Sequence, residues 1–203
     1  MKVAVVGATG NAGTCLVKEL VSRGHQVTAI SRHADKVAGP NVTVKSLDAS
    51  DGQALAEALS GHDAVISALR FSDTDAARLI DAVKRSGVKR YAVVGGAASL
   101  FAPGTTERLF DGPQFPEAYK PEAGAGVRFL DLLKQEKDLD WVFLSPSMIF
   151  AGTDRRGTFR LGKDELLVAE DGNSSISFPD FAIALVDELE TPKHHRERFT
   201  VGY

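Results

Sequence analysis

The chain begins MKVAVVGATGNAG, a short apolar run that leads directly into three glycines. The run from Val3 to Val6 predicts a strand that is buried on both faces, and the residues that follow the glycines have the spacing of a helix. Between the two, Gly7 permits a tight turn, Gly10 leaves the backbone bare, and Gly13 lets the helix pack closely. A chain that opens with strand, glycine loop and helix is predicted to adopt an α/β fold.

The rest of the chain continues this alternation at spacings of about 20–30 residues, which is typical of βαβ units. Such units make consecutive strands parallel and their crossovers right-handed. We therefore expect a doubly wound, mainly parallel sheet. The expected strands are residues 3–6, 26–31, 42–47, 63–67, 90–94 and 141–144, and the expected helices are residues 11–23, 50–60, 73–86 and a segment within 116–137.

The segment after Phe150 has a different pattern. Two short strands, a helix and a closing edge strand are expected there, at residues 158–161, 166–169, 179–190 and 199–201. No linker or low-complexity tract separates this segment from the rest. We therefore expect one domain over residues 1–203, in which residues 151–203 form a small C-terminal cap or extension on the substrate side.

The composition argues against several classes of protein. A net charge of −3, with scattered basic residues, gives no reason to expect nucleic acid or an anionic membrane as a partner. Cys15 is the only cysteine, which excludes a disulfide framework and a cysteine-based zinc site, and the histidines lack metal-site spacing. No apolar run approaches the length of a membrane span. We expect a cytoplasmic protein without a metal.

The glycine loop predicts a binding site for a dinucleotide pyrophosphate. The first turn of the next helix offers free N–H groups and a partial positive charge, and Gly10 has no side chain to hold a phosphate away. No Gly-Lys-Ser/Thr follows the loop, which excludes a P-loop. The predicted contacts are Gly7, Thr9, Gly10, Asn11, Ala12 and Gly13.

The end of the second strand predicts which dinucleotide is preferred. An acidic residue at this point would bind the ribose 2′-hydroxyl of NAD(H). The chain has Ser31-Arg32-His33 instead, so no carboxylate repels a 2′-phosphate. Arg32 can bind that phosphate in a bidentate manner, and Ser31 can donate a further hydrogen bond. The sequence therefore favours NADP(H) over NAD(H), and a solvated surface arginine is the alternative.

The ends of the later strands complete the predicted cofactor site. Asp48 can accept a hydrogen bond from an adenine amino group, or it can cap a helix. Arg70 faces either a phosphate or solvent. Because parallel strands end at the same edge of a sheet, these residues are expected to meet the same ligand. They are Leu47, Asp48, Ala68, Leu69, Arg70, Gly95, Gly96 and Pro146.

The ordered motifs GATGNAG, AISR, VISAL, VVGGA, DWVFLSPS, FRLG and RFTVGY resemble the atypical short-chain dehydrogenase/reductase family. The likeness covers essentially the whole chain and is strongest to the NmrA-like and NADH-flavin reductase groups, relatives of biliverdin-IXβ/flavin reductase. It implies a Rossmann-type domain that binds NADP(H) and reduces free flavin or a similar planar conjugated acceptor. Some related proteins only sense nucleotides, so a non-catalytic NADP(H)-sensing regulator is the alternative.

The wider dehydrogenase superfamily uses a Tyr-x-x-x-Lys pair, in which the lysine lies one helical turn from the tyrosine and lowers its pKa. That pair is missing here. Tyr119 is followed directly by Lys120, with Ala123 at the required offset. Tyr91 has Gly95 at that offset. We therefore name no catalytic residue.

The missing acid bears on the reaction. Interconversion of an alcohol and a ketone needs such a group, whereas hydride transfer to a flavin ring does not. The sequence therefore favours a flavin or quinone acceptor, or no reaction. Isomerisation or reduction of a natural product is a third reading, and it requires an acid that the sequence does not reveal.

Aromatic and apolar residues after the strand ends predict where the acceptor binds. Several lie in a long loop after the fifth strand, and a loop of this length is typical of a lid. FMN, FAD, riboflavin or a quinone-like molecule is expected to bind as a substrate. The sequence is also compatible with a homodimer. Any one of these side chains could instead pack beneath the loop. The predicted contacts are Phe101, Phe115, Tyr119, Met148 and Phe150.

Overall fold

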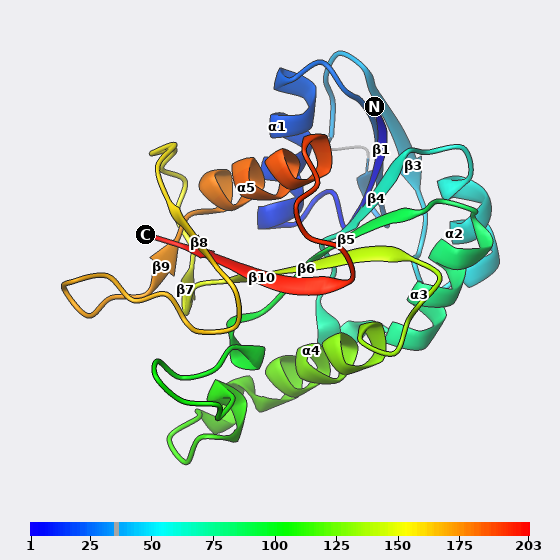
Figure 1. Ribbon diagram of the computed structural model, residues 1–203. Coiled ribbons are helices and arrows are strands. Elements are labelled where there is room, and N and C mark those ends of the chain that lie inside the picture. The colour runs from blue at the N-terminus through cyan, green and yellow to red at the C-terminus, as the bar shows by residue number, and fades with distance from the viewer. Residues whose placement is uncertain (35–36) are drawn as a thin grey trace.

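The computed structural model describes residues 1–34 and 37–203, which form an eight-stranded sheet with helices on both faces (Figure 1). The strand order is β3-β2-β1-β4-β5-β6-β10-β8. These strands are β1 (Lys2–Val6), β2 (Gln26–Ser31), β3 (Val42–Ser46), β4 (Ala64–Ser67), β5 (Arg90–Val94), β6 (Asp140–Pro146), β8 (Arg160–Gly162) and β10 (Glu197–Gly202). A separate parallel pair consists of β7 (Ile149–Phe150) and β9 (Ser175–Ile176). The α-helices are α1 (Asn11–Ser22), α2 (Gly52–Leu59), α3 (Ala76–Arg85), α4 (Lys120–Leu133) and α5 (Phe178–Glu190).

The sheet is parallel from β3 through to β10, and only β8 runs antiparallel, against β10. The carboxyl ends of the parallel strands therefore lie at one edge. The chain direction across the sheet reverses between β1 and β4, which is the switch point where doubly wound sheets bind ligands. The predicted doubly wound, mainly parallel sheet is confirmed.

Two hydrophobic cores lie on opposite faces of the sheet. Helices α1 and α5 cover one face, and α2, α3 and α4 cover the other (Figure 1). Side chains of a strand point alternately to the two faces. In β1, Val3 and Val5 therefore join the α1 and α5 core, while Ala4 and Val6 join the other. This explains the uninterrupted apolar run with which the chain begins.

Two helices begin later than the sequence predicts because an aspartate caps each of them. The side chain of Asp51 accepts a hydrogen bond from the Ala54 amide, and α2 begins at Gly52. The side chain of Asp75 accepts one from the Arg78 amide, and α3 begins after it. The capping side chain, and not the apolar stripe, sets the first turn.

The C-terminal segment departs most from the prediction. Residues 166–169 are not a strand. Their backbone instead begins beside the long loop after β5, where the Leu166 amide donates to the Phe101 carbonyl. The strand expected at residues 158–161 is β8, shifted toward the C-terminus. Residues 199–201 lie in β10, which is not the edge strand because β8 pairs with its outer side. Strands β7 and β9 were not predicted.

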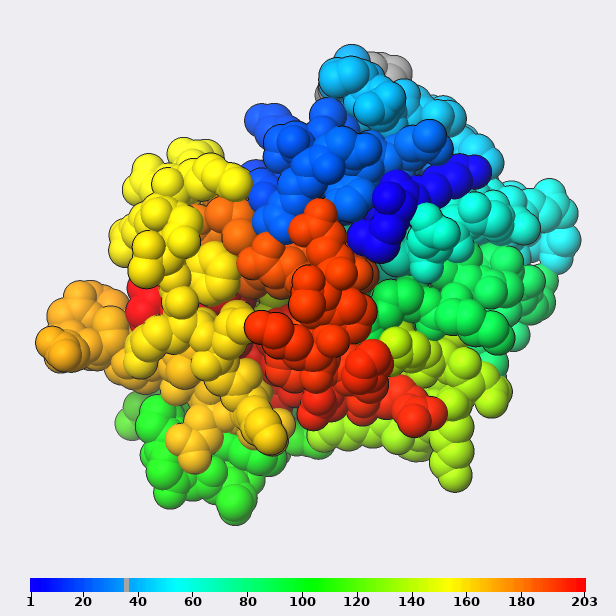
Figure 2. Space-filling model, turned by 45° about the horizontal axis from the view of Figure 1, so that its top comes forward, coloured from blue at the N-terminus to red at the C-terminus, as the bar shows by residue number. Residues whose placement is uncertain are grey.

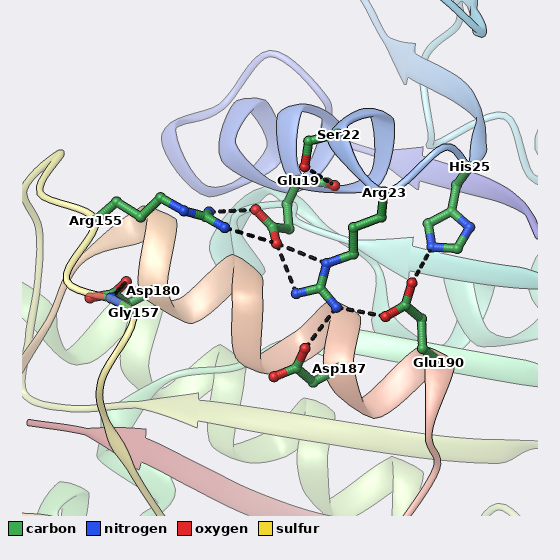
Figure 3. A network of polar contacts seen from close by, with 9 residues as sticks. All are labelled: Glu19, Ser22, Arg23, His25, Arg155, Gly157, Asp180, Asp187 and Glu190. Atoms are coloured by element: carbon green, nitrogen blue, oxygen red, sulfur yellow. Dashed lines mark hydrogen bonds and ion pairs between the residues drawn. The ribbon is translucent and has the colours of Figure 1, made fainter.

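A polar network joins α1, α5 and the segment after β7 (Figure 3). Glu19 is only 4% exposed and accepts hydrogen bonds from Arg23 and Arg155. Arg23 also donates to Asp187 and Glu190 of α5. Burial alone would raise the pKa of Glu19, but the hydrogen bonds from both arginines outweigh it and hold that pKa below its usual range. Figure 2 shows this yellow segment packed beside blue α1 and orange α5.

Candidate functional site

The glycine loop lies at the carboxyl edge of the sheet, between β1 and α1. Gly7 has a φ of +86°, and its amide donates to the Ile30 carbonyl at 2.9 Å. A Cβ on Gly7 would lie 2.5 Å from the carbonyl oxygen of Ala68, and one on Gly13 would lie 2.1 Å from the carbonyl oxygen of Gly7. The packing of the protein itself therefore requires both glycines.

Gly10 is a glycine for a different reason. A Cβ there would meet only two carbonyl oxygens, of Gly7 at 3.5 Å and of Ala68 at 3.9 Å, which are ordinary contacts. Gly10 is the N-cap residue of α1, and no side chain caps that helix. The N-cap residue therefore offers the first-turn amides no side-chain partner, and the side chains of Thr9 and Asn11 next to it are exposed. A glycine without a side chain and an uncapped helix N-terminus would together allow a pyrophosphate to approach the backbone closely.

The ends of β2 and β3 form one corner next to this loop. The Thr9 hydroxyl donates to the Ser31 hydroxyl at 3.2 Å, and Arg32 is exposed. Asp48 accepts a hydrogen bond from the Ser50 amide at 2.9 Å. Hydrogen bonds from Ser50, with a contribution from the Arg32 guanidinium, hold the pKa of Asp48 below its usual range. Asp48 is therefore an ionised turn residue beside Arg32, and the helix cap is Asp51.

The end of β4 lies between the glycine loop and α4. Ala68 and Leu69 are half-buried, and Arg70 is exposed. The carboxylate of Glu122, in the first turn of α4, accepts hydrogen bonds from the amides of Phe71 at 2.8 Å and Ser72 at 2.9 Å. Sequence reasoning missed Glu122, and no local pattern marks it, because its partners lie on another element.

The predicted residues at the ends of β5 and β6 are more enclosed. A Cβ on Gly95 would lie 2.3 Å from a ring carbon of Phe143, so packing explains this glycine. Gly96 has more room, since its nearest neighbour would be Phe71 at 3.9 Å. Pro146 is buried as the last residue of β6, where it pairs with Val201.

The predicted acceptor residues differ in exposure and in what they pack against. Met148 and Tyr119 are strongly exposed, at 61% and 66%. Phe115 contacts Phe110 with ring centroids 5.4 Å apart. Phe150 packs against two phenylalanines of α5 at 4.6 Å. Phe101 lies in a backbone bridge to Arg108, at the base of the loop after β5.

Neither Tyr91 nor Tyr119 is an exposed acid supported by a lysine. Tyr91 is fully buried, and its hydroxyl lies 2.9 Å from that of Ser67. Burial raises the pKa of Tyr91 far above its usual range. Tyr119 is exposed, but the neighbouring Lys120 pairs with Glu117. Neither of these two tyrosines is therefore placed as the acid of a tyrosine–lysine pair.

A hollow lies along the flank of α1, away from the strand ends. It has a volume of about 480 Å³ and is lined by Cys15, Lys18 and Thr153 among others. Burial raises the pKa of the Cys15 thiol. Across residues 1–34 and 37–203, no group of His, Cys, Asp and Glu side chains is arranged to hold a metal ion. Across the same residues, no helix is long and apolar enough to cross a membrane.

Comparison with known proteins identifies relatives along the whole chain. A family model described as NAD(P)H-binding matches residues 7–192. An uncharacterized Bacillus subtilis protein, YwnB, is 41% identical, and the match covers 99% of this chain and 98% of that protein.

Two solved structures are also similar. One is a "putative epimerase" from Bacteroides thetaiotaomicron, at 44% identity and a TM-score of 0.93, with 100% of this chain and 96% of that chain covered. The other is a "putative NADH-flavin reductase" from Streptococcus pneumoniae, at 38% identity and a TM-score of 0.89, with 100% and 99% covered.

Proposed function

Because the chain belongs to the family of NAD(P)H-binding proteins, we propose that it is an NADPH-dependent reductase of free flavin or a similar planar conjugated acceptor. The observation that carries the proposal is the bare, uncapped start of α1 at Gly10. The printed name of the Streptococcus pneumoniae relative adds support for the reductase class. Bound NADPH supplies a hydride that, with one proton from water, converts an oxidised flavin to its two-electron reduced form.

In this proposal the glycine loop holds the pyrophosphate. The amides of Asn11 and Ala12 lie in the uncapped first turn of α1, where N–H groups and the helix dipole favour an anion. Gly10 allows the phosphate oxygens to approach the backbone. The proposed cofactor site between the carboxyl ends of β1 and β4, the crevice, would have Ala68 and Leu69 on its other side, since the Ala68 carbonyl lies directly against Gly7.

The preference for NADPH rests on the corner between β2 and β3. The exposed Arg32 follows β2, and the residue that ends the strand is Ser31 and not an acid. A guanidinium binds the two oxygens of a 2′-phosphate in a bidentate manner. Asp48, beside Arg32, would accept from the adenine amino group with its second oxygen, because the first is engaged by Ser50.

The choice of a flavin or quinone acceptor rests on the acid that is missing. Reduction of a ketone requires a proton donor at the carbonyl oxygen, and Tyr91 is too deeply buried to serve. A flavin ring needs only to be held against the nicotinamide, with one proton taken from water. Met148, Tyr119 and the loop that carries Phe101 supply exposed or half-buried apolar surface for such a ring.

A non-catalytic sensor of NADP(H) is the second candidate, because the same missing acid suits a protein that only binds. Epimerisation, the activity in the name of the Bacteroides thetaiotaomicron relative, requires an acid–base group at the reacting carbon. The buried Tyr91 argues against that reaction here.

One experiment separates these functions. Purified protein and NADPH are mixed in turn with FMN, FAD, riboflavin and a simple quinone, and the nicotinamide absorbance band is followed. Saturable loss of the band is the expected result. Tight NADPH binding without turnover of any acceptor would contradict the reductase and favour the sensor.

A further inference from the structure

Helix α4 contacts both loops that border the crevice. Its first turn carries Glu122, which contacts the β4–α3 turn, and its last turn carries Asp131, which contacts the loop after β5. The first loop carries Ala68, Leu69 and Arg70 of the proposed cofactor contacts, and the second carries Phe101 and Phe115 of the proposed acceptor contacts. The two carboxylates therefore connect one rigid helix to the two sides of the site.

Glu122 holds the β4–α3 turn by its backbone. Both carboxylate oxygens are used, one for the Phe71 amide and one for the Ser72 amide. The Phe71 ring is held as well, because a Cβ on Gly126 of α4 would lie 2.9 Å from it. A carboxylate that accepts two adjacent N–H groups makes charge-assisted bonds that an amide cannot reproduce, since its NH₂ would face a donor.

This turn continues directly into the wall of the cofactor crevice. Arg70 lies with its Nε 3.9 Å from Glu122, and Ala68 lies against the glycine loop at Gly7. A shift of the turn would therefore be transmitted over two or three residues to the backbone that contacts Gly7. Because interiors are close-packed, a small shift there changes the space left for the pyrophosphate.

Asp131 holds the other wall through a side chain. Arg108 donates to its two carboxylate oxygens at 2.7 Å and 3.1 Å, which is a bidentate pair. Arg108 pairs by its backbone with Phe101, and the Leu109 amide donates to the Leu100 carbonyl at 2.8 Å. The pair therefore fixes the base of the loop that carries Phe101.

We propose that Glu122 and Asp131 are positioning residues with separate targets, Glu122 for the bound nicotinamide dinucleotide and Asp131 for the acceptor. The inference rests on the proposed reductase function, because that function assigns the two walls their ligands. Neither residue contacts the reacting atoms. Because each acts through one loop, replacement of Glu122 should change the NADPH affinity and replacement of Asp131 the acceptor KM, each without a large effect on the other constant.

The test compares Glu122→Gln and Asp131→Asn, with Asp81→Asn as a matched carboxylate-to-amide control. Asp81 lies on α3, where it forms an exposed pair with Arg85. NADPH affinity is measured by fluorescence titration, and the acceptor KM is measured with FMN. Glu122→Gln is expected to raise the Kd of NADPH about tenfold, as much as the loss of one charge-assisted contact between the displaced turn and the nucleotide, with little change in the KM of FMN. Asp131→Asn is expected to raise the KM of FMN, with little change in the Kd of NADPH. Asp81→Asn is expected to change neither constant.

A merely structural role would give a different result. If both variants change both constants in proportion to a fall in Tm, or if neither constant changes, the proposal is wrong. Glu122→Asp keeps the charge and should recover part of the NADPH affinity, and it replaces Glu122→Gln if that variant does not fold.

Hydrogen exchange separates this inference from the proposed function. The Phe71 and Ser72 amides should exchange faster in Glu122→Gln, and residues 100–109 should exchange faster in Asp131→Asn. If the wild-type protein reduces no acceptor, the reductase proposal fails while exchange and titration still test the role of Glu122. Unchanged exchange in both variants, with wild-type turnover intact, would overturn this inference alone.

Discussion

Replacement of Gly10 by alanine separates the demands of the fold from those of the ligand. The added methyl group would lie 3.5 Å from the nearest backbone oxygen, so it fits without moving the loop. Alanine is a poorer N-cap residue than glycine, and the expected loss of stability is about 1 kcal/mol or less. Gly13→Ala would place its methyl group 2.1 Å from the Gly7 oxygen and should destabilise the protein by about 1–3 kcal/mol or more.

The effect on binding should be much larger. A methyl group on Gly10 would stand between the first turn of α1 and a phosphate oxygen, at the cost of at least one charge-assisted hydrogen bond. Such a bond contributes about 1.5–3 kcal/mol, which corresponds to a rise of about 10- to 100-fold in the Kd of NADPH.

Fluorescence titration with NADPH measures this effect, and thermal unfolding measures the stability. Gly52→Ala is the matched control, because a Cβ at this first residue of α2 would meet only the flexible end of Arg85, at 3.2 Å. Its Kd should equal that of the wild type. A folded Gly10→Ala protein with wild-type affinity would refute the assignment of the loop to a pyrophosphate.

Three further predictions concern other parts of the molecule. Arg32→Ala should raise the Kd of NADPH about 10- to 100-fold, because a charge-assisted contact is lost, and leave the Kd of NADH unchanged. Equal effects in titrations with both nucleotides would contradict the preference for NADPH. Tyr91→Phe should lower the free energy of unfolding by about 1 kcal/mol, since the hydrogen bond between Tyr91 and Ser67 is lost. It should not lower kcat for FMN, and a large fall in kcat would mean that Tyr91 acts as an acid. Glu19→Gln should destabilise the protein by about 1–3 kcal/mol at neutral pH in chemical denaturation. The folded-state pKa of Glu19 lies below its unfolded value, so this contribution is complete at neutral pH and disappears as the pH falls through the folded-state pKa. A difference from wild type that persists in acid would contradict the ion-pair explanation.

The part of the fold that follows from local spacing is predictable from the sequence. The order of strands and helices from β1 to β6 depends on apolar runs, glycine stops and turn residues that act within a few positions of themselves. The segment after β7 is less regular, and its pairing depends on distant partners. Leu166 donates to the backbone of Phe101, and β10 has β8 on its outer side, which no local pattern reveals.

The predicted cofactor residues follow the same division. Gly7, Gly10 and Gly13 were recognised together by their spacing, yet only the structure distinguishes them. Packing of the loop requires Gly7 and Gly13, whereas it does not require a glycine at Gly10. Packing also explains Gly95, because a Cβ there would clash with the ring of Phe143 on the neighbouring strand β6.

By itself, the sequence determined the strand–glycine loop–helix unit, the basic residue after β2 and the absence of a Tyr-x-x-x-Lys pair. Each is a matter of residue type and spacing along a few turns of chain. Only the tertiary structure decided that Tyr91 is buried, that Phe150 packs against α5 and that Glu122 holds the β4–α3 turn. These outcomes depend on which helix covers which strand, and close packing between distant segments, not local conformation, determines that.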